Sequence, residues 1–95
     1  MAKPTKPDAD RTRWSFGTLL RWHLQHGTRP DGHPDRPGIK WKQKDFAGSC
    51  GYGADSNVRR WINDSDKPNF ERIAAALFGT SDVYREWRNE LFRAW

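Results

Sequence analysis

Residues 54–68 read ADSNVRRWINDSDKP, and this stretch decides the fold. Val58, Trp61 and Ile62 lie at positions i, i+3 and i+4, which is the spacing of one face of an α-helix. The other positions carry polar side chains, namely Ser56, Asn57, Arg59 and Arg60. The pattern therefore predicts a helix over 55–63 that a core holds on one side. Its other side exposes hydroxyl, amide and guanidinium groups.

A second short helix is expected directly before this one, over 41–50. Its apolar face holds Phe46, Ala47 and Cys50. The residues GYG at 51–53 predict a turn, and Asp55 or Ser56 can cap the helix that follows. Two short helices joined by a tight glycine-containing turn are the plan of the helix-turn-helix motif.

Three further helices are expected over 14–26, 69–78 and 82–95. Ser15 can cap the first of them and Gly27 can close it. No run of alternating β-branched residues competes with the helical pattern. The predicted fold class is all-α, a small orthogonal bundle of about five helices that contains a helix-turn-helix.

The helices predict one domain over 14–95 of this 95-residue chain. Residues 1–13 are rich in proline and charge and almost free of apolar groups, so a disordered basic arm is expected there. Residues 28–40 hold three prolines and two glycines and predict a loop without regular secondary structure. A loop of this length is either functional or a tolerated insertion.

Composition restricts the partners and the compartment. The formal net charge is +5, which favours a polyanion such as DNA or RNA as partner. The single cysteine, Cys50, excludes an internal disulfide and fits a reducing compartment. The sequence has neither a membrane-spanning apolar run nor the apolar core of a signal peptide, so a cytoplasmic protein without membrane contact is expected.

Four segments resemble the helices of a known family. They are FGTLLR at 16–21, KQKDFA at 42–47, VRRW at 58–61 and KPNFERIAAAL at 67–77. Their order and spacing resemble the lambda-repressor-like (Cro, XRE-type) helix-turn-helix DNA-binding domain over roughly residues 14–79. This resemblance implies double-stranded DNA as partner and a role in transcription regulation.

The resemblance also implies which residues read the bases. In that family the second helix of the motif lies in the major groove, which corresponds here to the helix over 55–63. Ser56, Asn57 and Arg60 would face base edges, where asparagine can pair with adenine and arginine with guanine. Arg59 would reach a phosphate or a base, depending on how the helix is rolled.

Phosphate contacts are implied at four positions. Gln43 would bind a phosphate at the start of the second helix, helped by the helix-end amides. Backbone charge would come from Lys42, Lys44 and Lys67.

Some features differ from the family pattern and leave a second function open. The connection over 28–40 is about a dozen residues longer than the family has, one extra residue separates Ala47 from Val58, and Asp55 stands near the start of the recognition helix. The alternative function is a protein-interaction or adaptor domain of a larger multidomain protein, with weak or no DNA binding. In that case the two arginines would be solvated helix charges that pair with Asp55 or Asp64.

The last helix is the candidate surface for a second copy of the chain or for further domains. Its aromatic and apolar residues are Tyr84, Trp87, Leu91, Phe92 and Trp95. The chain stops while its pattern is still helical, so it could be the N-terminal module of a longer protein.

The sequence carries no signature of catalysis, and neither a metal ion nor a cofactor is expected. It has no glycine-rich phosphate loop, no nucleophile elbow and no metalloprotease motif, so the protein is not expected to be an enzyme. Spacing does not gather His23, His26, His33 and Cys50 into a tetrahedral site. Cys50 is expected to be a buried structural thiol.

Overall fold

The computed structural model describes residues 14–95, and it is helical throughout. Five α-helices and one short 3-10 helix follow one another, and no strand occurs within the described range. Their bounds are α1 Phe16–His26, α2 Gln43–Ser49, α3 Asp55–Ile62, α4 Phe70–Phe78, η2 Asp82–Tyr84 and α5 Arg85–Ala94. The predicted all-α bundle is confirmed, whereas the arm predicted over 1–13 lies outside the described residues.

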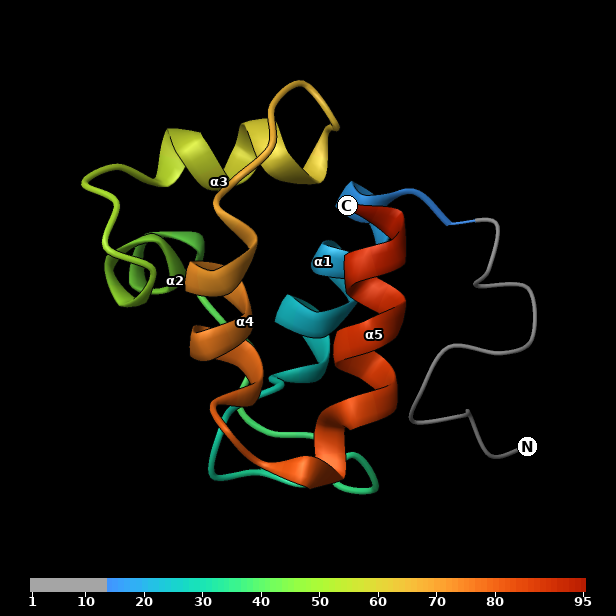
Figure 1. Cartoon of the computed structure of the whole chain (residues 1–95). Coiled ribbons are helices and arrows are strands. Elements are labelled where there is room, and N and C mark those ends of the chain that lie inside the picture. Colours follow the sequence, from blue (N-terminus) through green and yellow to red (C-terminus); the bar gives the residue numbers. More distant parts are fainter. Residues whose placement is uncertain (1–13) are drawn as a thin grey trace, which may run out of the picture.

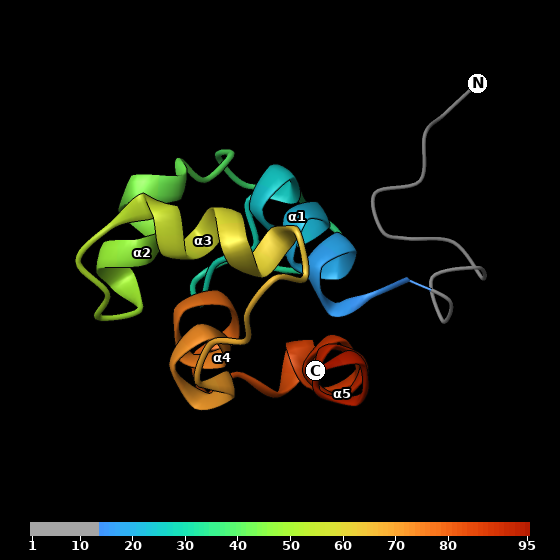
Figure 2. The same ribbon diagram turned by 90° about the horizontal axis from the view of Figure 1, so that it is seen from above.

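The helices cross one another rather than lying parallel (Figures 1 and 2). In Figure 2, α4 and α5 are seen nearly end-on while α3 runs across the view, so α3 lies crosswise to both. The first helix contacts both α3 and α5, and α2 packs against α3. The α2–α3 pair therefore occupies one side of the bundle, and α5 packs against α1 and α4 on the other.

Local capping signals set both ends of α1 and the start of α4. The Ser15 hydroxyl accepts a hydrogen bond from the Thr18 N–H at the start of α1, and Gly27 ends that helix with a φ of 78°. Asn69 caps α4 in the same way. The cap predicted for α3 is wrong, because neither Asp55 nor Ser56 occupies the capping position. Ala54 does, with no side-chain hydrogen bond.

The core draws on every helix. It comprises buried side chains at the helical spacing that the sequence predicts, among them Leu19, Leu20, Phe46, Val58, Trp61, Ile73, Leu77 and Leu91. Large aromatic side chains bury much area per residue, and they supply a core in a short chain of low apolar content. Cys50 is buried, as expected, and free.

The prediction for the last helix needs correction. The chain first forms η2 over Asp82–Tyr84, with the Ser81 hydroxyl accepting from the Val83 N–H, and α5 follows. Tyr84, Trp87 and Leu91 were expected to form a partner surface, but all three are buried. They are not available to a second copy, because α1, α4 and the loop before α2 already cover them. The two other members of that set differ: Phe92 is 55% exposed and Trp95 is half-buried.

The loop over 28–40 is fastened to the bundle. It has no regular secondary structure apart from turns and an isolated β-bridge between His33 and Arg36. Where it returns to α2, the Trp41 indole N–H donates to the Thr28 carbonyl at 2.8 Å, which ties its two ends together.

Candidate nucleic-acid interface

The core anchors α3 by one face only. Val58 is 0% and Trp61 2% exposed, and Ile62 is half-buried against the same core. On the outward side Arg59 and Arg60 are exposed, while Ser56 and Asn57 are intermediate. The helix thus presents guanidinium, amide and hydroxyl groups on a rigid support, as the sequence predicts.

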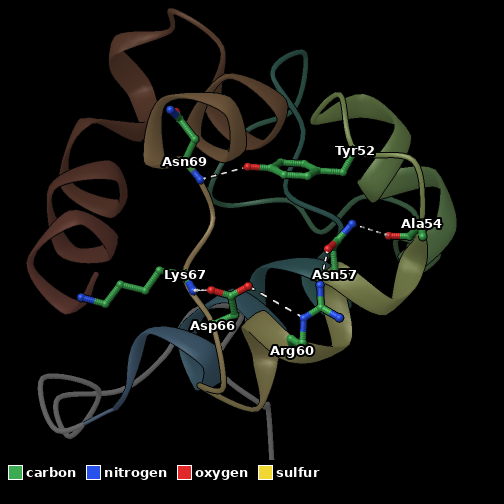
Figure 3. Close-up of polar contacts among 7 residues, drawn as sticks. All are labelled: Tyr52, Ala54, Asn57, Arg60, Asp66, Lys67 and Asn69. Atoms are coloured by element: carbon green, nitrogen blue, oxygen red, sulfur yellow. Dashed lines mark hydrogen bonds and ion pairs between the residues drawn. The ribbon is translucent and has the colours of Figure 1, made fainter.

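Asn57 and Arg60 form one hydrogen-bonded unit with a carboxylate from the next turn (Figure 3). An Arg60 terminal nitrogen donates to Asn57 Oδ1 at 2.6 Å, and Arg60 Nε lies 3.8 Å from Asp66 Oδ2. The Asn57 amide nitrogen donates to the Ala54 carbonyl at 3.3 Å. The carboxylate that pairs with Arg60 is therefore neither Asp55 nor Asp64, the two partners that the sequence suggested.

Tyr52 holds the α2–α3 turn against the start of α4. Its ring packs edge-on against Trp61 with centroids 4.8 Å apart, and its hydroxyl accepts a hydrogen bond from the Asn69 N–H at 3.2 Å. Figure 3 shows the ring spanning this gap. The guanidinium of Arg72 lies 5.3 Å above the same ring. Sequence reasoning missed both Tyr52 and Asp66, because their contacts join separate turns and no local spacing points to them.

Arg59 and Gln43 meet on the other flank of α3. Both line a cavity of about 360 Å³ between α1, the segment before α2, and α3. Two further cationic side chains, Arg21 and Lys40, line it as well. Within residues 14–95 Arg59 makes no hydrogen bond or ion pair through its side chain, so its guanidinium is available to an anion.

The lysines predicted to contact phosphates do not form one group. Lys42 and Lys44 are exposed at the start of α2, on either side of Gln43 in the chain, and neither lines the cavity. The Lys67 ammonium instead lies 5.4 Å above the Trp95 ring at the end of α5, and Figure 3 shows its side chain directed away from Arg60. The structure therefore brings Gln43 and Arg59 together and places Lys67 apart from them.

Residues 14–95 contain neither a cluster of metal ligands nor a thiol with a lowered pKa. Between Trp14 and Trp95 no three His, Cys, Asp or Glu side chains lie close enough to hold a metal ion. Burial raises the pKa of the Cys50 thiol to about 12, and the positive charge of Arg72 offsets this only in part. No helix in this range is long and apolar enough to span a membrane.

Comparison with known proteins found no match for this chain among protein-family models, curated proteins or solved structures.

Proposed function

We propose that this protein is a double-stranded DNA-binding module of a cytoplasmic transcription regulator, with α3 in the major groove. The observation that carries the proposal is the two-sided build of α3. Val58 and Trp61 fix the helix in the core, while Arg59 and Arg60 stand exposed on the opposite side. A major groove about 12 Å wide admits such a helix, and arginine and asparagine are the side chains that pair with purine edges there.

The contacts on the two flanks suggest a division of roles. Asn57 and Arg60 are already oriented by their mutual hydrogen bond, so they lose little side-chain freedom when they meet base edges. Ser56 lies in the first turn of α3, directly before Asn57. Arg59, with Lys42, Gln43 and Lys44, would face the DNA backbone.

The first test is fluorescence anisotropy with a labelled random-sequence DNA duplex at two salt concentrations. We expect binding that weakens steeply with salt, because each neutralised phosphate contributes about −0.9 to the slope of log K against log salt. Arg60→Ala should bind more weakly, and Lys44→Ala should reduce the salt slope by about 1.

Arg93→Ala is the matched control, since it removes the same charge from an exposed position on α5. Equal losses in Arg60→Ala and Arg93→Ala would mean that only net charge attracts DNA. The absence of binding even at low salt would contradict the proposal.

A second candidate function rests on the end of α5. Phe92 is 55% exposed, and its ring lies against Trp95 and Phe70 with centroids 6.0 and 5.0 Å away. Such a patch suits an adaptor or self-association surface in a larger protein. Sedimentation equilibrium of the wild type and of Phe92→Ser tests self-association, and a monomer in both cases would exclude a homodimer through this patch.

A further inference from the structure

The side chains that line the cavity beside α3 suit a ligand that has both an anionic group and a larger organic part. Its volume is about 360 Å³, which falls within the range of about 300–1,000 Å³ typical of small-molecule sites. A bare phosphate would fill only part of it. We infer that this cavity binds a nucleoside phosphate, held through its phosphate group by Arg21, Lys40 and Arg59.

The charge of the cavity points to the phosphate. Arg21 comes from α1, Lys40 from the segment before α2, and Arg59 from α3, so three separate elements bring positive charge to one place. None of the residues that line it is acidic. Within residues 14–95 none of the three side chains is engaged in a hydrogen bond or ion pair. A phosphate monoester carries a charge near −1.5 to −2 with three strong acceptor oxygens, which matches three unpaired cations better than a carboxylate does.

The remaining lining suits the sugar and the base. Side-chain amides are contributed by Gln25, Gln43 and Asn63, and each amide offers both a donor and an acceptor. Such amides can pair with base edges and ribose hydroxyls. Apolar contact comes from Leu24, Trp41 and Ile62.

The wall formed by Trp41 is fixed before any ligand arrives. Its indole N–H donates to the Thr28 carbonyl at 2.8 Å, and its backbone N–H donates to the Leu24 carbonyl at 2.9 Å. The Arg29 guanidinium stacks 3.8 Å above its ring. A wall held in this way costs little ordering on binding. The long loop over 28–40 therefore has a function in this proposal, because it supplies Lys40 and leads directly into Trp41.

Two sources can deliver a nucleoside phosphate: a free mononucleotide, whose monoester carries the charge of about −1.5 to −2, or a nucleotide unit of DNA, whose diester carries a single negative charge. The inference does not depend on base reading by α3, since Arg21 and Lys40 lie outside that helix. Nuclear magnetic resonance titration of ¹⁵N-labelled protein with adenosine monophosphate tests it, with the Trp41 indole and the Asn63 side chain as reporters. Adenosine and inorganic phosphate, which are the two fragments of this nucleotide, are titrated separately. Duplex DNA is added as the competitor.

We expect adenosine monophosphate to saturate the reporter shifts at millimolar or lower concentration. Adenosine should bind about tenfold or more weakly, because a charge-assisted phosphate contact is lost. Arg21→Ala should weaken binding about tenfold as well, whereas Arg93→Ala should leave it unchanged. Lys40→Ala, on an exposed irregular segment, is the second variant should Arg21→Ala fail to fold.

Equal affinity for adenosine and its monophosphate would overturn the inference, as would the absence of shifts at the two reporters. Displacement of the mononucleotide by duplex DNA would identify a DNA nucleotide as the occupant. A ternary complex with DNA would identify a free mononucleotide instead, and both results support the site. Arg60→Ala separates the two proposals, because it should weaken DNA binding and leave mononucleotide binding intact.

Discussion

Asp64 caps α1 from a position 49 residues farther along the chain: its Oδ2 accepts a hydrogen bond from the Ser15 hydroxyl at 2.7 Å. Its Oδ1 accepts the Gly17 N–H at 2.9 Å. Asp64 has a φ of 59°, the only non-glycine residue with positive φ in the described range. A carboxylate at a helix N-terminus is favoured by free N–H groups and by the helix dipole. One side chain thus fastens the end of α3 to the start of α1.

We expect Asp64→Ala to lower the free energy of unfolding by about 1–3 kcal/mol, since it removes the cap and leaves a residue that disfavours positive φ. Asp64→Asn should lose less, because asparagine tolerates this backbone conformation and can still accept one hydrogen bond. Urea unfolding measures both. Asp31→Ala is the control for charge, because Asp31 is exposed in the loop over 28–40, outside any helix, and forms no ion pair within 14–95. A loss in Asp64→Ala no larger than in Asp31→Ala would show that the cap adds nothing.

Two helical glycines should respond oppositely to alanine. A Cβ at Gly17 would lie 2.5 Å from the Ile62 carbonyl oxygen and 2.7 Å from that of Trp61, so α1 and α3 would have to separate. We expect Gly17→Ala to destabilise the fold by about 2 kcal/mol or more, as overpacking does. Gly48, within α2, has nothing within 4 Å of that position. Gly48→Ala should therefore stabilise the fold by about 0.5–1 kcal/mol through helix propensity.

Thermal unfolding of both variants alongside the wild type checks this pair. A melting temperature that is unchanged or raised in Gly17→Ala would contradict the close approach of α1 to α3, and one that is lowered in Gly48→Ala would contradict the open space beside α2.

Features that depend on residues close together in the sequence, such as helix ends and core positions, were predictable. Ser15 and Gly27 mark the ends of α1 through contacts within a few residues, and the helical spacing of Val58 and Trp61 correctly places them in the core. The cap on α1 by Asp64 was not predictable, because it depends on how α3 lies against α1. Local patterns report hydrogen bonds between near neighbours, whereas such contacts form only in the assembled fold.

The candidate site likewise has one part that was predictable from the sequence and another that was not. The exposed polar face of α3 follows from its periodicity. The Asp66 partner of Arg60 and the cavity between three elements do not, because the folded chain brings them together from separate segments. The burial of Tyr84 and Trp87 was missed for a related reason. Rings of α1 cover Trp87 and Phe78 of α4 packs on Tyr84, so their burial depends on how separate helices pack.

The Asp66 carboxylate should restrain DNA binding if α3 reads the major groove. It pairs with Arg60 and places a negative charge beside the outward face of the helix. We expect Asp66→Ala to tighten binding of a random duplex by about twofold to tenfold at low salt, since a like charge is removed and the arginine is released. Stability should change by less than about 1 kcal/mol, because the pair is exposed.

Asp82→Ala is the matched control for this comparison, because Asp82 also pairs with an arginine, Arg85, at an exposed position away from α3. Anisotropy titrations compare the two variants with the wild type. An equal gain in both would trace the effect to net charge alone.

Stability at high pH should depend on the Cys50 thiol. Burial raises its pKa from 9.0 to about 12, so the folded state keeps the proton that the unfolded chain loses near pH 9. The stabilisation linked to this group is fully present below pH 9 and is lost as the pH rises through the window from 9 toward 12. Within that window the free energy of unfolding should fall by up to about 1.4 kcal/mol per pH unit from this group.

Cys50→Ala isolates the contribution of the thiol from those of tyrosine and lysine residues that titrate in the same range. We expect the variant to be less stable than the wild type at pH 7, because it leaves a small cavity, and the difference to shrink between pH 9 and 11. Urea unfolding at several pH values in reducing buffer measures this difference. A difference that stays constant with pH would show that the thiol ionises as readily in the folded protein as in the unfolded chain, which its burial against Phe46 and Ala47 in the core argues against.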